Sequence, residues 1–421
     1  MIKSVILFII TYILLLIFPK YRPVSVAAAA LTAVVSGVIP VSAALSSIEW
    51  NVILMIAGTM GVMYMFNESG MPERIADILM NRAKNVRQAI IFLSLLSGIV
   101  SAFVDNVATV LLLAPIAVSV SRKQNISPVK SVMAVSLASC LQGAATLVGD
   151  TTSIMLGSYA GMDFIDFFCI FGKPGLFWIV QAGMLAATGV LWLSMRKETD
   201  KTEKREPSKV SDIFPTVLLA AMVSVLVALS FVREKPEISS GLSCVVIMLI
   251  GAVREALKKR RAAGFVSVLS SVDTGTIALL AGLFVVIGGM KYNGAIDKAG
   301  KLIINAFGSD RFVMFSVLVW GSVLVSAFVD NIPYVAAMLP VVRYVSFTLG
   351  SEPYLLYFGL LCGATLGGNI TPIGASANIT ALGILKREGY TVRTGEFMKL
   401  SVPYTAAAVA VGYISVWLLW S

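Results

Sequence analysis

The chain has 421 residues, of which 57% are hydrophobic and only 13% are charged, and its mean hydropathy is +0.88. A soluble domain carries about 25% charged residues, and its core cannot absorb this much apolar sequence. The composition therefore excludes an ordinary soluble protein and favours a polytopic helical protein of the lipid bilayer. The net charge of +10 does not indicate nucleic-acid binding, because basic residues concentrate in the cytoplasmic loops of membrane proteins.

Long apolar segments recur along the whole chain, and each is predicted to be helical. Runs of about 20 residues match the ~30 Å thickness of the hydrocarbon layer at ~1.5 Å per residue. The first segment has some features of a signal peptide, but Pro19–Arg22 is a poor cleavage region, so we expect a retained helix. The predicted segments are 4–18, 23–41, 51–66, 88–104, 106–120, 128–161, 174–195, 213–232, 238–253, 275–290, 311–329, 331–346, 353–385 and 398–420.

One hexapeptide, Ser-Ala-Phe-Val-Asp-Asn, occurs in both halves of the chain, at Ser101–Asn106 and Ser326–Asn331. The same spacing of 225 residues pairs Gly149 with Gly374. Self-similarity at a fixed spacing is typical of duplicated structural units. We interpret each hexapeptide as the tip of a re-entrant hairpin, because the arms on either side have about 15–19 residues and are slightly short for a full crossing.

The number of crossings in each half is odd, so the second repeat is predicted to be inverted relative to the first. With the polar linker 196–212 placed in the cytoplasm, the loops on that side hold most of the 33 lysine and arginine residues. This bias follows the positive-inside rule, and it places both termini on the outer side of the cell membrane. The predicted repeats are 1–195, with a hairpin at 88–120 and a broken helix at 128–161, and 213–421, with a hairpin at 311–346 and a broken helix at 353–385.

Three aspartates, Asp105, Asp150 and Asp330, lie in apolar surroundings. A charge near the bilayer centre costs about 2.5–3.5 kcal/mol on insertion scales, so such residues usually face a cavity or a partner and mark ion pathways. Asp105 and Asp330 could instead only cap the second arms of their hairpins, because aspartate is a preferred N-cap. The two interpretations are compatible, since a helix N-terminus at the midplane can itself face a substrate.

A break rich in glycine, proline and hydroxyl residues interrupts each long segment, at 142–153 in the first half and at 367–378 in the second. Glycine and proline disfavour an uninterrupted helix, and unwound backbone at membrane depth must line a cavity or be buried in protein. Paired breaks of this kind indicate a transporter site, where free carbonyl groups can bind Na⁺ and helix N-termini can face an anion. The alternative is close helix packing through small residues.

Several other classes of function are disfavoured. The chain has no Walker A sequence, which argues against ATP-driven transport within it. It has no histidine, so any proton transfer falls to carboxylates. No nucleophile–base pair suggests an enzyme, and we expect no cofactor other than Na⁺ or H⁺ as the coupling ion.

The hairpin tips, Gly149-Asp150 and Gly374–Asn378 closely resemble the ArsB/NhaD-like permeases of the ion transporter superfamily, to which the melanosomal P protein also belongs. That group is similar to the divalent anion/sodium symporters. The resemblance implies an all-α polytopic membrane protein with two inverted repeats, each with about five transmembrane helices, a re-entrant hairpin and a broken helix. It also implies a homodimer with an elevator-like transport domain. The sequence departs from the usual pattern at Thr151–Ser153, where relatives often have Pro-Pro-Asn, so hydroxyl groups would have to supply the ion ligands there.

The residues at the tips and breaks form the predicted substrate and ion site, and none of them is assigned a catalytic role. Na⁺ is expected at the two tip pairs, Asp105–Asn106 and Asp330–Asn331. The full predicted set is Asp105, Asn106, Thr109, Gly149, Asp150, Thr151, Thr152, Ser153, Asp330, Asn331, Asn369, Thr371, Gly374, Ser376 and Asn378.

These expectations describe a secondary active ion transporter. Three acidic groups and no obvious basic group at the motifs favour coupling to H⁺ or Na⁺, so we expect antiport or efflux, either Na⁺/H⁺ exchange or arsenite-type export. Two alternatives stay open: Na⁺-coupled symport of a small anion such as a dicarboxylate or citrate, and a passive anion channel on the same scaffold. The expected partners are a small ion or anion, the lipid bilayer and a second copy of the chain, with no nucleic acid.

Overall fold

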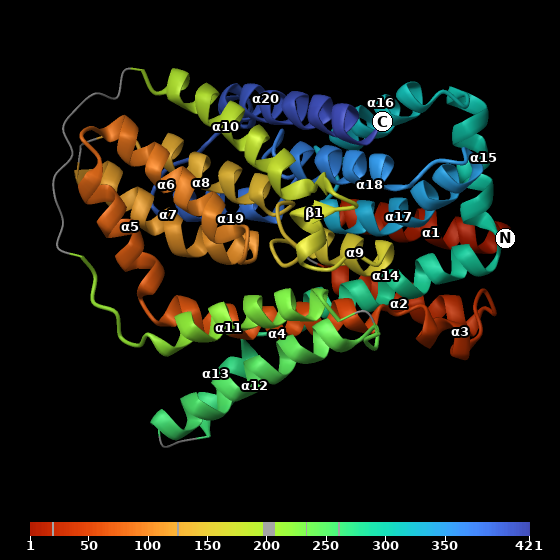
Figure 1. Ribbon diagram of the computed structural model, residues 1–421, viewed down its shortest axis with the longest axis horizontal. Coiled ribbons are helices and arrows are strands. Elements are labelled where there is room, and N and C mark those ends of the chain that lie inside the picture. The colour runs from red at the N-terminus through yellow and green to blue at the C-terminus, as the bar shows by residue number, and fades with distance from the viewer. Residues whose placement is uncertain (19–20, 124–125, 197–206, 233, 260–261) are drawn as a thin grey trace.

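The computed structural model describes the chain except for residues 19–20, 124–125, 197–206, 233 and 260–261. The regular secondary structure of the described residues is almost entirely helical (Figure 1). A short 3₁₀ turn, η2 (Ile165–Phe167), and a small hairpin of β1 (Cys169–Ile170) and β2 (Lys173–Pro174) precede α10. The helices of the first half are α1 (Ile2–Ile17), α2 (Arg22–Val35), α3 (Val41–Ser46), α4 (Trp50–Glu68), α5 (Met71–Arg82), α6 (Val86–Ser101), α7 (Asn106–Lys123), α8 (Val129–Gln142), α9 (Thr151–Ala160) and α10 (Leu176–Ser194).

The described helices of the second half follow the same order, so α11–α20 correspond one by one to α1–α10. They are α11 (Phe214–Ser230), α12 (Ser239–Lys259), α13 (Ala263–Ser270), α14 (Thr274–Tyr292), α15 (Ala295–Phe307), α16 (Arg311–Ser326), α17 (Asn331–Thr348), α18 (Tyr354–Leu361) with the π-turn η3 (Cys362–Leu366), α19 (Ser376–Arg387) and α20 (Thr394–Trp420). The predicted fold class, an all-α polytopic protein of two repeats, is confirmed.

Each repeat contains the predicted hairpin and broken helix. α6 and α7 form the first hairpin and α16 and α17 the second, with the two Asp-Asn tips between the arms. α8 and α9 are separated by an unwound stretch, as are η3 and α19. The π-turn at the start of the second break is a feature found often at functional sites.

Five described helices are long and apolar enough to cross a membrane, namely α4, α10, α12, α14 and α20. The other apolar helices are shorter, and α15 and α16 form a pair bent by 112°. Among these shorter helices, α6, α7, α8 and α18 are the hairpin arms and half-helices, for which a complete crossing is not required.

Four helices, α3, α5, α13 and α15, lie in segments predicted to be loops. α3 and α13 have only 6 and 8 residues, too few to form a crossing. α5 and α15 carry charged residues on one face, which lowers their average hydropathy. Local signals mark two of them: α5 has Pro72 in its first turn and Arg82 in its last, and α15 begins after Gly294 and ends before Gly308, both with positive φ. The predicted helix 23–41 is also too long and ends at Val35.

The two repeats are interlocked through their second and fourth helices. α4 packs closely along α12, and α14 packs closely along α2. A Cβ on Gly58 would lie 2.6 Å from the backbone nitrogen of Val245, and one on Gly282 would lie 2.7 Å from a methyl group of Val26. Glycine at these equivalent positions lets the backbones approach, which is how helices associate in membranes.

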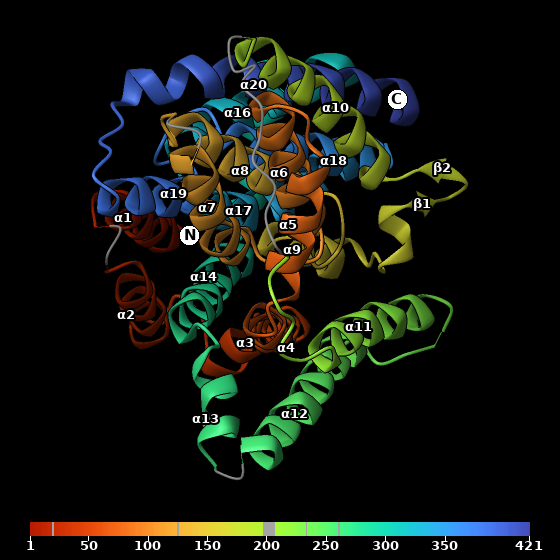
Figure 2. The same cartoon turned by 90° about the vertical axis from the view of Figure 1, so that its left-hand side faces the viewer.

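These four helices, together with α11 and α13, which pack against α12, form a layer that we call the peripheral helices. The hairpins, broken helices, α10 and α20 form the central body, in which α10 and α20 lie side by side. Figures 1 and 2 show α11–α13 on one side of the molecule and α10 with α20 on the other. We call the end where α10 ends and α11 begins the linker end; α5 and α13 lie there, and α3 and α15 lie at the opposite end.

Candidate functional site

The aspartates at the hairpin tips cap the second arms. Asp105 Oδ1 accepts hydrogen bonds from the amides of Val107 and Ala108, at 3.0 and 3.1 Å. Asp330 Oδ1 accepts one from the amide of Ile332 at 3.2 Å. Each cap uses one carboxylate oxygen, so the second oxygen remains for another ligand. Capping and binding are therefore compatible at both tips.

Each tip is fastened to the broken helix of its own repeat by equivalent hydrogen bonds. The Thr146 hydroxyl donates to the carbonyl of Ala102, and the Thr371 hydroxyl donates to the carbonyl of Ala327. A Cβ on Gly149 would lie 3.0 Å from the Ala102 carbonyl oxygen. The tip and the break thus form one rigid unit in each repeat, and glycine is required where they meet.

The serines of the hairpins make a second set of equivalent contacts. Ser101 Oγ donates to the carbonyl of Ser139 at 3.0 Å, and Ser326 Oγ donates to the carbonyl of Ala364 at 2.5 Å. Ser101 Oγ also lies 2.7 Å from Asn106 Oδ1. These bonds pair the buried hydroxyl groups of the two serines, which is necessary at membrane depth.

The two repeats meet through polar side chains from both breaks. Asn331 Nδ2 donates to Asp150 Oδ2 at 3.1 Å. Ser136 Oγ donates to Asn378 Oδ1 at 2.6 Å, and Asn369 Nδ2 donates to the carbonyl of Leu137 at 3.0 Å. The sequence predicts that the tips and breaks converge on one central site, and the geometry brings them together there.

A cavity of about 630 Å³ lies at this meeting point and extends toward the linker end. Its floor contains Asp105, Asp150 and Asp330, and a fourth carboxylate, Asp273, stands at the start of α14. The linker end is identified by Ser211, whose amide donates to the carbonyl of Ser69 at the C-terminal end of α4. The cavity lies along this same end of α4. The remaining polar lining residues are Tyr64, Asn67, Asn106, Cys140, Thr151, Ser271, Thr276, Asn331, Ser376 and Thr380.

A smaller space of about 20 Å³ lies between Asp105 and Asp150, with Thr59 and Gly149 on its walls. One water molecule needs roughly 10–15 Å³ of such volume. The space therefore admits a particle of the size of a water molecule between two carboxylates. No hydrogen bond to Asp105 Oδ2 is present among the described contacts, so this oxygen is free to bind such a particle.

The predicted site residues fall into two groups. Those that line the large cavity or the small space are Asp105, Asn106, Gly149, Asp150, Thr151, Asp330, Asn331 and Ser376. Those that lie behind this surface are Thr109, Thr152, Ser153, Asn369, Thr371, Gly374 and Asn378. In the second group, Ser153 and Thr371 donate to backbone carbonyls within their own repeats. The buried Thr109 hydroxyl has no hydrogen-bond partner among the described residues.

The expectation of no obvious basic group at the motifs is wrong, because Arg22 reaches the second tip. Its Nη1 lies 2.8 Å from Asp330 Oδ2, and the two side chains are only 18% and 7% exposed. Ser376 Oγ donates to the same oxygen at 3.0 Å. The contact joins residues 308 positions apart, so no local pattern marks it. Asp273 was missed for the same reason.

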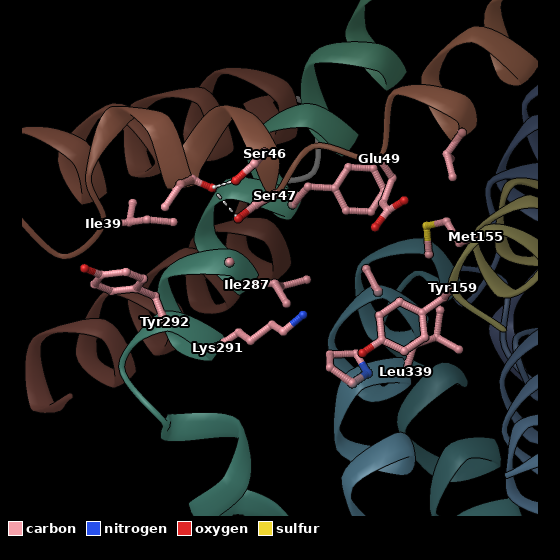
Figure 3. Close-up of a pocket in the computed structure, with 16 residues that line it drawn as sticks. Ile39, Ser46, Ser47, Glu49, Met155, Tyr159, Ile287, Lys291, Tyr292 and Leu339 are labelled. Carbon is pink, nitrogen blue, oxygen red and sulfur yellow. Dashed lines mark hydrogen bonds between the residues drawn. The ribbon is translucent and has the colours of Figure 1, made fainter. Parts of the chain in front are cut away.

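A second cavity, of about 450 Å³, lies toward the opposite end, between α3, α4, α9, α14 and α17 (Figure 3). Glu49, Tyr159 and Lys291 line it from different helices, and Ser158 Oγ donates to Glu49 Oε2 at 3.2 Å. On α4, Val52 lines this cavity and Met60 lines the linker-end cavity.

Buried apolar side chains separate the two cavities. Ile56 lies one helical turn from each of the α4 lining positions and is 2% exposed. Ile154 on α9 is also 2% exposed, and Val335 on α17 is fully buried. The candidate site is therefore reached through the linker-end cavity and is closed by an apolar layer toward the opposite end.

A model of the family described as citrate transporter, CitMHS, matches residues 12–263 and 255–421. The chain belongs to the CitMHS family. An uncharacterized transporter of Mycobacterium tuberculosis (strain H37Rv) is 31% identical over 385 residues, which cover 89% of this chain and 87% of that relative. This CitMHS protein is a polytopic membrane transporter.

The human P protein is 25% identical over 443 residues, covering 87% of the CitMHS chain and 53% of the P protein. The grouping predicted from the hairpin and break motifs is confirmed by this match. Among solved structures, the YdaH transporter of Alcanivorax borkumensis aligns with a TM-score of 0.60 and 15% identity, covering 87% of this chain and 84% of that one. MtrF of Neisseria gonorrhoeae aligns with a TM-score of 0.57 and 14% identity, covering 93% and 84%. At these identities the likeness concerns the fold.

Proposed function

We propose that this CitMHS transporter is a secondary active antiporter coupled to H⁺ or Na⁺, with its central site at Asp105, Asp150 and Asp330. One observation carries the proposal: four carboxylates and no described lysine or arginine line the linker-end cavity. Arg22 neutralises one of these carboxylates. The remaining negative charge, held away from bulk water, favours a bound cation or proton.

The geometry offers suitable oxygen ligands for a small cation such as Na⁺. The space between Asp105 and Asp150 is lined by these two carboxylates and by Thr59 and Gly149. Half-helix ends and unwound backbone near the midplane supply such ligands in secondary transporters. Na⁺ and H⁺ would compete there, because both are attracted to the same carboxylate oxygens, and this competition is the basis of exchange.

Alternating access is supported by the two cavities on either side of an apolar layer. In this state the site opens to the linker end. We propose that the central body moves against the peripheral helices in an elevator-like manner, which would open the site toward the cavity in Figure 3. The fastening of each tip to its own broken helix supports movement as one body.

The positive-inside bias supports a cytoplasmic linker, and it makes the linker-end cavity the cytoplasmic entrance, with both termini outside. A homodimer in the cell membrane is part of the same proposal. Cross-linking of the protein in native membranes, followed by mass measurement, tests the dimer; a single-copy mass at all cross-linker concentrations would contradict it.

The proposed exchange is tested in proteoliposomes loaded with a pH-sensitive dye. Addition of Na⁺ outside should drive H⁺ out of the lumen and raise the internal pH, and Asp150→Asn should abolish the response. A channel would instead let one ion flow down its own electrochemical gradient whether or not the other ion is present. Such an independent flux would exclude the antiporter. The apolar layer between the cavities speaks against a continuous passive path.

A second candidate is cation-coupled transport of a small carboxylate, which the family description favours. The amide groups of Asn106 and Asn331 and the first turns of α7 and α17 are the groups that could hold an anion. Efflux of a larger solute has a structural precedent, because MtrF represents a class of antimetabolite efflux pumps. Uptake of labelled citrate without Na⁺/H⁺ exchange would favour the carboxylate carrier over the antiporter.

A further inference from the structure

One basic residue, Arg22, contacts the candidate site from outside the central body. Its Nη1 donates to Asp330 Oδ2 at 2.8 Å, while its Nε lies 3.4 Å from the carbonyl of Leu15. Both partners of the ion pair are largely shielded from solvent. Removing one partner of such a pair leaves the other charge uncompensated in a poorly solvated place. The pair therefore stabilises any state in which the two groups can meet.

The partners belong to parts of the molecule that are held together separately. Arg22 begins α2, whose Val26 packs against Gly282 of α14 in the peripheral layer. Asp330 caps α17, and the tip in front of it is fastened to the second broken helix through Thr371. The ion pair bridges the peripheral helices and the central body. A movement of the tips toward the opposite end must break it.

The aspartates of the two hairpin tips differ in their hydrogen-bond partners. Asp330 Oδ2 is shared by Arg22 and Ser376, whereas Asp105 is bound only by backbone amides of its own helix among the described contacts. A cation that enters through the linker-end cavity reaches Asp330 beside the guanidinium. Two cations on one carboxylate oxygen repel each other, so binding of the one weakens binding of the other.

We propose that Arg22 is a built-in counter-ion that competes with the transported cation for Asp330. In the cation-free protein, Arg22 holds the second tip beside α2, with the site open to the linker end. A cation bound at Asp330 displaces the guanidinium and releases the tip for movement. This inference rests on the proposed antiport and deepens it, because a carrier that is locked when empty can move only when loaded, which makes exchange obligatory.

The competition is tested by Na⁺ binding to the purified full chain, followed as ²²Na⁺ retention in a scintillation proximity assay at fixed pH. Arg22→Gln removes the competitor, and we expect about tenfold tighter Na⁺ binding, within the usual range of coupling between sites. Arg22→Lys keeps the charge and should stay near the wild type. In an Asp330→Asn background, Arg22→Gln should change the Na⁺ affinity little, because the shared partner is gone.

Arg122 provides a matched control, because its guanidinium pairs with Glu388 at 2.6 Å on an exposed surface. Arg122→Gln should leave the Na⁺ affinity unchanged. Equal Na⁺ affinities of wild type, Arg22→Gln and Arg22→Lys would overturn the competition. A looser Na⁺ affinity in Arg22→Gln would overturn it as well, because the arginine would then help to build the site.

The locking role has its own readout, which does not depend on Na⁺ binding. Leu339 is 3% exposed and lines the opposite-end cavity. In a Cys169→Ser background, Leu339→Cys should react slowly with a maleimide when Na⁺ is absent. Adding Arg22→Gln should raise that rate several-fold, because the tip is no longer held; an unchanged rate would overturn the lock. An absence of saturable Na⁺ binding in the wild-type protein contradicts the proposed Na⁺/H⁺ exchange instead, and the labelling rates then decide on the lock alone.

Discussion

Asn331, at the tip of the second hairpin, donates a hydrogen bond to Asp150, at the break of the first broken helix, over 3.1 Å. The two residues are 181 positions apart and come from different repeats. Asp150 Oδ2 also accepts from the hydroxyl of Thr152 at 2.9 Å. The central site is therefore completed only when both repeats are folded together, and its carboxylates are oriented by side chains from both.

The tip aspartates should matter for their charge more than for their caps. Asp105→Asn and Asp330→Asn keep a side chain that caps helices equally well, so the cap itself should be preserved in both. Asp330→Asn also removes the partner of Arg22, so its thermal stability should fall more than that of Asp105→Asn. Each change removes a negative charge from the cavity, and a loss of even about 1.4 kcal/mol in cation binding lowers the affinity tenfold. We expect Na⁺/H⁺ exchange in proteoliposomes to fall at least to that extent.

Asp310 supplies the control for these variants, since it caps α16 on an exposed surface through the amide of Val313 at 2.9 Å. Asp310→Asn should retain full exchange. Near-wild-type exchange in both Asp105→Asn and Asp330→Asn would reduce these aspartates to helix caps.

The close contact between α4 and α12 predicts a large effect of one methyl group. In Gly58→Ala the added Cβ would overlap the backbone at Cys244 and Val245, which cannot move aside without displacing α12. Overpacking of this kind costs about 1–3 kcal/mol. The apparent melting temperature in detergent should fall. Gly321→Ala, on α16 with no atom within 4 Å of the added Cβ, should not lower it; equal effects of both changes would contradict the packing account.

The linker end is held by a charge cluster with a defined pH dependence. Asp212 accepts from Arg254 at 2.5 Å and from Lys258 at 2.8 Å. The hydrogen bonds from Arg254, opposed by partial burial and reinforced by Lys258, hold the pKa of Asp212 well below its usual value. A depressed pKa contributes stability above the unfolded-state value of about 3.9 and loses it as the pH falls through the folded-state value.

Asp212→Asn should therefore lower the apparent melting temperature by a constant amount between pH 5 and pH 8, on the basis of that reference pKa of about 3.9. The difference from the wild type should shrink only below about pH 4. A difference that disappears already near neutral pH would show that the cluster does not act through the Asp212 carboxylate.

Single cysteines can report which face each cavity opens to. Thr380 lines the linker-end cavity, and Ser46 lines the opposite one. In a Cys169→Ser background, which removes the exposed native thiol, Thr380→Cys should react with an impermeant maleimide only from the cytoplasmic face. Ser46→Cys should react only from outside. Labelling of both positions from one face would contradict the two-sided arrangement and the proposed orientation.

The parts of the site that could be predicted from sequence are those that the duplication repeats. The Asp-Asn tips and the glycine-rich breaks occur twice at one spacing, so each occurrence supports the other, and the structure brings them to one cavity. Long apolar runs likewise predict α4, α10, α14 and α20 because hydropathy alone determines them.

Other parts depend on contacts that no local pattern contains. Arg22 reads as an ordinary cytoplasmic charge before an apolar run, and only the folded chain places it on Asp330. The short helices α5 and α15 are amphipathic and lie in polar stretches, so their mean hydropathy is too low to distinguish them from loops. Their ends could have been found from helix signals at Pro72 and Gly308.

The most direct test of the central claim is equilibrium ²²Na⁺ binding to purified wild-type protein and to Asp150→Asn across a pH series. A cation site at the carboxylate cluster predicts saturable binding by the wild type, suppressed as the pH falls because protons compete for the same oxygens. Asp150→Asn should still fold, judged by a single cooperative melting transition, and lose this binding. Saturable binding that is the same in Asp150→Asn, or that does not respond to pH, would contradict the account.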